Sequence, residues 1–237
     1  MTNIVLTVRG RYRLTEQAFR SLLDHTSPDQ FNLTIVHDAS GDLNFKVGRL
    51  VEAAAGWPNI TALSVLNSNH KLSSLKRLGI EWSCARFGSD GWLCTVDSDV
   101  YFGNDWLSTM VTAAELTRGL GFKLWGGQQH PYHHAIAVVG GTQTPETYLE
   151  EYEALPGTHW FMPWSTWWEF GNSFVSSAPG VCQGEDVSFC QAIRNHDGRI
   201  GVVKPFCVAD CGLTNTEGKP QPGAELRTER WLGVLYE

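Results

Sequence analysis

Two carboxylates separated by a single residue, Asp97 and Asp99, lie at the end of an apolar run, GWLCTVD (91–97). Side chains two residues apart in an extended chain point the same way, so both carboxylates can face one ligand. Mg²⁺ and Mn²⁺ prefer oxygen ligands and commonly bridge protein carboxylates and the phosphates of a bound ligand. The pattern therefore predicts a metal-dependent diphosphate site, although an Asp-Ser-Asp sequence can also simply end a strand in a turn.

The elements that would position this pair alternate between strands and helices. Apolar runs predict strands at 3–8, 32–38, 60–67 and 91–97, and helical periodicity predicts helices between them at 14–25, 44–55 and 72–87. Such a succession predicts a parallel sheet with helices on both faces, whose ligand edge lies at the carboxyl ends of the strands. Arg9, Asp38 and the Asp97–Asp99 pair follow the first, second and fourth strands, and we expect them at this edge.

Beyond residue 103 the pattern predicts shorter and more mixed elements. A helix is expected at about 104–118, and the runs 122–129 and 135–141 are typical of strands in a more antiparallel region. The remaining expected elements are helices at 144–155 and 185–196 and a strand at 201–209. Residues 214–237 are Gly- and Pro-rich and are expected to form a polar tail.

Composition limits the class of protein. The 237 residues carry a formal net charge of −7, and 42% are hydrophobic, which is ordinary for one globular α/β domain. The acidic balance argues against a nucleic-acid backbone as the main partner, since phosphate binding needs a basic surface. No stretch is long enough to span a membrane, and the apolar start MTNIVLTVRG is too short for a signal peptide. We therefore expect a cytoplasmic protein without a transmembrane segment.

Six cysteines are present, and none forms a CxxC pair. In a cytoplasmic protein we expect them to be reduced and mostly buried. A zinc site built from Cys182, Cys190, Cys207 and Cys211 is the alternative, which their irregular spacing disfavours.

Five segments resemble, in the expected order, motifs of family 2 glycosyltransferases with the GT-A fold. VDSDVYF resembles the strand-terminal D-x-D, IVLTVRGRYRLTEQAFRSLLDHT the opening strand, nucleotide loop and first helix, and IVHDASGD the second strand. HKLSSLKRLGI is similar to the family's Ala-Arg-Asn-x-Gly segment, with Lys76 and Arg77 at the Arg and Asn positions. GEDVSFCQAIRNHDGRI resembles the segment around the catalytic base. The similarity covers residues 1 to about 213.

The resemblance implies an α/β fold, a single GT-A domain over 1–213 with a Rossmann-like, mostly parallel sheet flanked by helices and a mixed or antiparallel C-terminal part. A donor half (1–102), an acceptor and catalytic half (103–213) and a C-terminal tail (214–237) are implied within this order. The implied activity is metal-dependent transfer of a hexosyl or pentosyl group from a nucleotide-diphosphate sugar, by default a UDP-sugar, to an acceptor hydroxyl.

The resemblance also implies which residues bind the donor and the metal. Asp38 corresponds to the acidic residue that contacts the nucleotide base. The other expected donor-binding residues are Thr7, Arg9, Arg13, Lys76, Arg77 and Asp97. Asp97 and Asp99 would hold Mn²⁺ or Mg²⁺, and Asp210 in FCVADCGLTN occupies the position where the family often has a histidine as third ligand.

Asp186, with Glu185 beside it, is the general base that the resemblance implies. An inverting transfer needs a group that removes the proton of the acceptor hydroxyl while its oxygen attacks the anomeric carbon, so we predict inversion. Gly184-Glu185-Asp186 is also a favourable helix N-terminus, and this alternative requires no catalytic role.

Four tryptophans within nine residues, Trp160, Trp164, Trp167 and Trp168, precede Asn172. Aromatic rings can stack on sugars or bases, but tryptophan is also highly buried on average, so we expect one or two of these rings at the acceptor and the others in the core. The acceptor candidates are Trp164, Trp167, Trp168, Asn172 and His133, and a polar loop is the alternative for His133. The acceptor itself could be a glycan, a lipid-linked sugar, a protein or a modified nucleobase.

Three other classes of protein share some of these sequence features. A haloacid-dehalogenase-type phosphatase also has a D-x-D after an apolar strand, but there it follows the first strand and not the fourth. A non-catalytic GT-A domain would bind a glycan or nucleotide sugar without turnover, and the presence of Asp97, Asp99 and Asp186 argues against it. A dinucleotide-dependent oxidoreductase is disfavoured because VRGRYR follows the first strand in place of G-x-G-x-x-G.

Overall fold

The computed structural model describes residues 1–9, 12–39, 45–66, 72–127, 137–141, 148–174 and 185–211, with residues 45, 137–141, 148, 185 and 210 described as backbone only. Its first half confirms the predicted alternation of strands and helices. The elements are β1 (Thr2–Val8), α1 (Tyr12–Asp24), β2 (Phe31–Asp38), α2 (Phe45–Ala54), β3 (Ile60–Val65), α3 (Leu72–Phe87) and β4 (Trp92–Asp97).

The second half is more mixed, as predicted. Its helices are α4 (Trp106–Thr117), η2 (Arg118–Leu120), α5 (Trp164–Phe170), η3 (Gly171–Ser173) and α6 (Glu185–Arg194). Its strands are β5 (Val100–Phe102), β6 (Phe122–Gly126), β7 (Ala137–Gly141), β8 (Tyr148–Glu151), β9 (His159–Pro163), β10 (Arg199–Lys204) and β11 (Val208–Asp210). The strand expected at 201–209 is therefore two strands in different sheets.

Within the described residues, nine strands form one sheet in the order β3-β2-β1-β4-β9-β6-β10-β8-β7, and β5 and β11 form a second, two-stranded sheet. The pairs β3–β2, β2–β1 and β1–β4 are parallel, whereas β9 is antiparallel to both β4 and β6. After β1 the chain moves outward through β2 and β3, then returns to β4 on the other side of β1. This reversal creates a topological switch point between β1 and β4, the place where open α/β sheets bind ligands.

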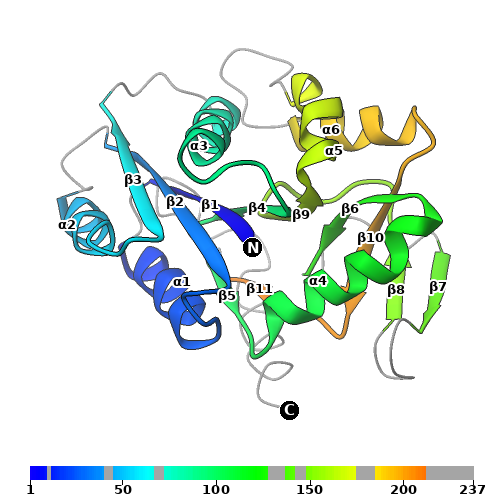
Figure 1. Cartoon of the computed structure of the whole chain (residues 1–237), viewed down its shortest axis with the longest axis horizontal. Coiled ribbons are helices and arrows are strands. Elements are labelled where there is room, and N and C mark those ends of the chain that lie inside the picture. Colours follow the sequence, from blue (N-terminus) through cyan, green and yellow to red (C-terminus); the bar gives the residue numbers. More distant parts are fainter. Residues whose placement is uncertain are drawn as a thin grey trace.

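Helices cover both faces of the sheet, α1, α2 and α4 on one and α3, α5 and α6 on the other (Figure 1). Side chains alternate between the faces along each strand, so Ile4 and Leu6 belong to the first core and Val5 to the second. Gly79 allows α3 to lie directly on the sheet, because a Cβ there would lie 2.4 Å from Val36 and 2.6 Å from Val5. Residues one turn before Gly79 therefore sit over the carboxyl ends of β1 and β4.

The helix expected at 144–155 was wrong, since the structure has strand β8 there. Cross-strand contacts to β10 explain the difference. The side chain of Glu151 is 2.7 Å from Arg199, that of Glu150 is 3.2 Å from Lys204, and Leu149 is fully buried. Glutamate and leucine favour helices in isolation, but paired charges and a buried apolar residue opposite a neighbouring strand override that preference.

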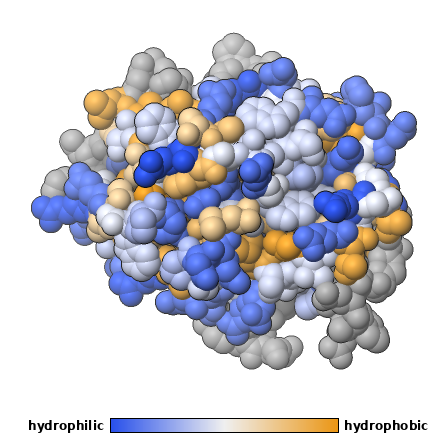
Figure 2. Space-filling view, viewed as in Figure 1, coloured by the Kyte–Doolittle hydropathy of each residue, from blue (hydrophilic) through white to orange (hydrophobic). Residues whose placement is uncertain are grey.

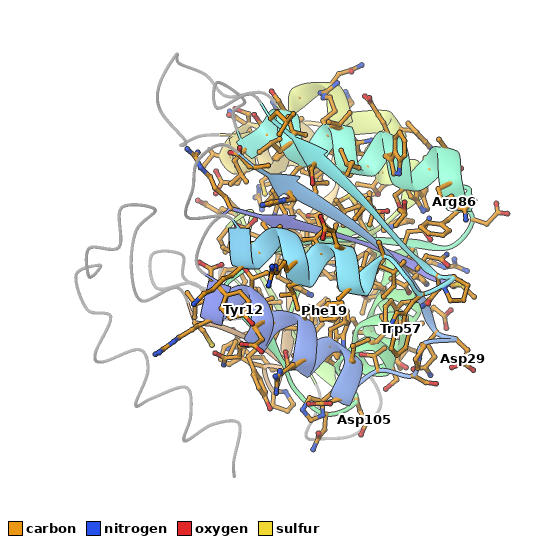
Figure 3. All side chains as sticks on the ribbon, turned by 90° about the vertical axis from the view of Figure 1, so that its left-hand side faces the viewer. Tyr12, Phe19, Asp29, Trp57, Arg86 and Asp105 are labelled. Atoms are coloured by element: carbon orange, nitrogen blue, oxygen red, sulfur yellow. The ribbon has the colours of Figure 1, made fainter. Side chains whose placement is uncertain are left out.

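Among the described residues, no helix is both long and apolar enough to cross a membrane. Hydrophilic and hydrophobic side chains alternate in small groups over the face drawn in Figure 2. The opposite ends of the sheet are marked in Figure 3, with Tyr12 at the start of α1 on one side and Asp29, Trp57 and Arg86 on the other. Tyr12 follows the carboxyl end of β1, so its side is the expected ligand edge.

Candidate functional site

Thr7 and Asp97 lie side by side at the switch point. They are partners in the parallel register of β1 and β4, and both belong to the face of the sheet that α3 covers. The Thr7 side chain is buried, and its hydroxyl has no hydrogen-bond partner among the residues that the structure describes. Since a buried hydroxyl without a partner is unfavourable, this group fits a place where a bound ligand or water completes the hydrogen bond.

Asp99 is placed by a turn, and not by the extended strand that the sequence argument assumed. Strand β4 ends at Asp97, residues 98–99 form the turn, and β5 begins at Val100 in the second sheet. The backbone carbonyl of Asp99 accepts a hydrogen bond of 2.6 Å from the amide of Cys211. The side chain of Asp99 is half-buried.

Asp210 comes close to Asp99 through the backbone. It is the register partner of Val100 in the antiparallel pair of β11 and β5, so it lies next to the turn that carries Asp99. Its side chain lies outside the described residues. Two carboxylates from the β4 turn and a third acid from a neighbouring strand end are a donor set that suits Mn²⁺ or Mg²⁺. The described side chains alone contain no group of three acids, histidines or cysteines that could hold a metal.

Lys76 faces this acidic turn from α3. Its side chain is 2% exposed, and its Nζ lies 2.8 Å from Oδ1 of Asp97, whose side chain is 20% exposed. The same ammonium donates a hydrogen bond to the carbonyl oxygen of Gly157. Lys76 is predicted to contact the donor, and in the structure its ammonium neutralises the first carboxylate of the D-x-D.

No sequence pattern indicated a functional role for the loop around Gly157. This loop lies between Lys76, the partner of Asp97, and Asp186 of α6. A Cβ on Gly157 would lie 3.5 Å from Nζ of Lys76 and 3.7 Å from Cβ of Asp186. The adjacent Thr158 accepts a hydrogen bond of 2.9 Å from the amide of Asp97. Asp186 is therefore brought beside the Lys76–Asp97 pair by residues that are distant in sequence. The only local signal was Pro156-Gly157, a turn dipeptide ahead of an apolar run.

Asp186 lies in the first turn of α6 and is half-buried. Its Oδ1 accepts a hydrogen bond of 2.8 Å from the amide of Val187, the next residue of the same helix. This contact satisfies one of the amides that a helix start leaves open, so the helix-terminus alternative has a geometric basis. Glu185 begins α6, and its side chain lies outside the described residues.

Asp38 ends β2 at the same edge and is completely buried. Nε of Arg9, which is half exposed, lies 3.3 Å from Oδ2 of Asp38. Both residues are expected at the nucleotide, and the structure brings them together.

Arg13 is exposed on α1 and lines an open pocket of about 330 Å³ between α1 and Tyr101 of β5. His133 lies outside the described residues.

Arg77, a predicted donor-binding residue, contacts two of the predicted acceptor residues. Its guanidinium donates hydrogen bonds to the carbonyl oxygen of Gly171 at 2.6 Å and to Oδ1 of Asn172 at 3.5 Å. It also lies 6.0 Å from the centre of the Trp167 ring. Arg77 thus joins α3 to the turn that follows α5.

The tryptophan cluster is mostly core. Trp160, Trp164 and Trp167 are 1%, 3% and 4% exposed, so stacking of Trp164 or Trp167 on a sugar is not available in this conformation. Only Trp168 presents its ring, at 54% exposure, and it stacks on Trp164 with ring centres 5.6 Å apart. Three of the four rings therefore belong to the core, and the fourth lies on the surface.

The zinc alternative is not supported. Cys190 belongs to the core on the α3 side of the sheet and Cys207 to the core on the other side, so the sheet separates them. Burial raises the pKa of Cys190 and that of Cys207 to about 12, which keeps both thiols protonated. Cys182 lies outside the described residues.

His159, directly before the buried tryptophan of β9, is fully buried and is the register partner of Val96 in β4. Its Nδ1 accepts a hydrogen bond of 3.2 Å from the amide of Gly127, and Nε2 faces the Cys94 sulfur at 3.7 Å. Burial lowers the pKa of His159 to about 3, so the ring is neutral at pH 7 with its proton on Nε2.

This buried histidine predicts a pH dependence of stability. Between about pH 6.5 and pH 3 the unfolded state binds a proton at position 159 that the folded state excludes, so stability falls as the pH is lowered through this window. From pH 7 to pH 4.5 the loss from this group is about 2–3 kcal/mol. Urea unfolding at both pH values should show a smaller loss for His159→Asn than for the natural chain. Equal losses would contradict the assignment of His159 as the titrating group.

Comparison with known proteins bears on the fold. No protein-family model and no curated protein matches the chain. S. aureus TarS 1–349 superposes with a TM-score of 0.61 at 13% identity, over 89% of this chain and 60% of that one. GalNAc-T7 with UDP, GalNAc and Mn²⁺ gives a TM-score of 0.65 at 14% identity, over 89% and 43%. TarS 1–349 in complex with UDP-GlcNAc gives 0.59 at 15% identity, over 86% and 56%. The chain therefore spans from less than half to three fifths of these proteins.

Proposed function

We propose that a chain with this GT-A glycosyltransferase fold is itself a metal-dependent glycosyltransferase, which moves a sugar from a UDP-sugar to an acceptor hydroxyl. The observation that carries the proposal is the meeting of Thr7, Asp97, Lys76 and Asp186 at the switch point of the sheet. Solved neighbours contain UDP-GlcNAc, or UDP with Mn²⁺, and they support the same class of donor here.

In the proposed reaction the chain binds the nucleotide at the ends of β1 and β2, with Asp38 and Arg9 at the base. Asp97 and Asp99, with Asp210 as third acid, would hold Mn²⁺ or Mg²⁺, which when bound neutralises charge on the diphosphate. These residues suit a divalent cation because they would supply three carboxylates from neighbouring strand ends. The buried Thr7 hydroxyl lies beside Asp97 and is available to the donor.

Asp186 would act on the acceptor. Its carboxylate removes the proton of the acceptor hydroxyl while the oxygen forms a bond to the anomeric carbon, and the bond from that carbon to the diphosphate breaks. UDP leaves with the bonding electron pair, and the anomeric configuration inverts. Trp168 lies on α5, which starts near the amino end of β4. Trp168 would therefore contact a part of an extended acceptor that is far from the reacting hydroxyl.

A panel of nucleotide sugars tests the proposal by thermal shift with and without Mn²⁺. A UDP-sugar at about a hundredfold excess over its dissociation constant should stabilise the chain by about 2.7 kcal/mol, and thus raise Tm by roughly 5–10 °C. The increase should require Mn²⁺. Absence of a shift with every nucleotide sugar would contradict the proposal, and a product with retained configuration would contradict the role of Asp186.

A non-catalytic domain that binds a nucleotide sugar is the second candidate. The contact between Asp186 and the amide of Val187 favours it, because a helix-capping carboxylate needs no catalytic role. Binding of UDP-sugar and Mn²⁺ without release of UDP, in the presence of a range of glycan acceptors, would support this candidate over the enzyme.

A further inference from the structure

Lys76 places a positive charge inside the site that is proposed to hold a cation. The side chain is 2% exposed, so its ammonium is withdrawn from water and its position is fixed by two contacts, the carboxylate of Asp97 at 2.8 Å and the carbonyl of Gly157. A lysine is rarely buried to this extent unless it is paired. The ammonium therefore contacts one oxygen of the carboxylate that would also bind Mn²⁺.

The net charge around Asp97 affects how tightly a divalent cation can bind. Lys76 would cancel one of the three carboxylate charges that Asp97, Asp99 and Asp210 bring to the proposed metal site. A divalent cation alone would therefore bind to a weaker net negative charge, and the ammonium 2.8 Å from Oδ1 of Asp97 would repel it. The two negative phosphates of a donor would offset the charge of the ammonium and supply further oxygen ligands.

We propose that Lys76 is an internal counter-ion that makes metal binding conditional on the donor. The inference rests on the proposed function and concerns the order of binding at the same site. Without a diphosphate, the ammonium of Lys76 satisfies Asp97 and weakens the affinity for the free cation. With a diphosphate, cation and nucleotide bind together. Lys76 thus acts through Asp97 as a positioning residue.

The test compares Mn²⁺ binding, measured by calorimetry, in the absence and presence of UDP. The substitution Lys76→Met removes the charge, and Lys76→Gln removes the charge but keeps a hydrogen-bond donor in case the methionine variant does not fold. Both should bind Mn²⁺ alone at least about tenfold more tightly than the natural chain. The cooperativity between Mn²⁺ and UDP should fall in the same variants.

Arg86→Met is the matched control. Arg86 is a basic residue of the same helix at the opposite end of the sheet (Figure 3), so the substitution changes the net charge equally but far from Asp97. Its Mn²⁺ affinity should equal that of the natural chain. Unchanged or weaker Mn²⁺ binding in both Lys76 variants would overturn the role of Lys76. A natural chain that binds neither UDP nor Mn²⁺-UDP would instead overturn the proposed function, so the two failures are distinguishable.

Discussion

Asp186→Asn is expected to lower the turnover number by about 10²–10⁴-fold while leaving the affinity for UDP unchanged. The amide cannot take the proton of an acceptor hydroxyl at neutral pH. Its Oδ1 can still accept the hydrogen bond that the amide of Val187 makes to Asp186 at 2.8 Å, so the start of α6 should be preserved. Initial rates of UDP release and calorimetric binding of UDP measure the two quantities separately.

Glu185→Gln is the natural comparison, because Glu185 is the neighbouring acid at the start of α6. If Asp186 is the base, Glu185→Gln should retain most of the activity. A larger loss in Glu185→Gln than in Asp186→Asn would move the role of base to Glu185. If Asp186→Asn lowered the affinity for UDP as much as the turnover number, Asp186 would instead hold α6 in place and take no part in proton transfer.

The first half of the fold could be predicted because its information is local. Strands β1, β2 and β4 are short, mostly apolar segments, and each is followed or preceded by a helical repeat and a turn residue. Strand β8 could not be predicted in this way, since its glutamates gain their partners, Arg199 and Lys204, only when β10 lies beside it. Insertion of the antiparallel β9 between β4 and β6 is likewise decided by pairing across the sheet.

The positions of the candidate residues in the fold could be predicted one by one, but their contacts could not. Asp97 and Asp38 follow apolar strands and were expected at the ligand edge, where the structure places them. The contact between Lys76 and Gly157 joins residues 81 positions apart, and no local pattern contains it. Similarly, the hydrogen bond between Arg77 and Gly171 joins residues that no local pattern links.

Burial explains why the tryptophans were the least predictable part. Four rings within nine residues have the same chemistry, and periodicity alone does not say which faces solvent. The structure separates them, because β9 and α5 turn Trp160, Trp164 and Trp167 into one core and leave Trp168 exposed. Of these four rings, only that of Trp168 is exposed enough for the proposed contact with a sugar.

Asp99→Asn is expected to remove the part of donor binding that depends on Mn²⁺. Asp97 already shares one oxygen with Lys76, so Asp99 is the carboxylate of the turn on which the cation would depend most. The loss of metal affinity should exceed the roughly 10–100-fold effect of residues that only support a ligand. The fold should persist, because the β4–β5 turn is held through the backbone carbonyl of Asp99, which the substitution leaves in place.

Thermal shift with UDP, in the presence and absence of Mn²⁺, measures this effect directly. In the natural chain Mn²⁺ should add several degrees to the shift, and in Asp99→Asn it should add almost nothing. Asp90→Asn is the matched control, since Asp90 is an exposed acid before the amino end of the same strand. A Mn²⁺-dependent shift that survives in Asp99→Asn and disappears in Asp90→Asn would place the cation outside the β4 turn. If both variants kept the shift, the cation would bind through the nucleotide alone, and the acids at the switch point would have a purely structural role.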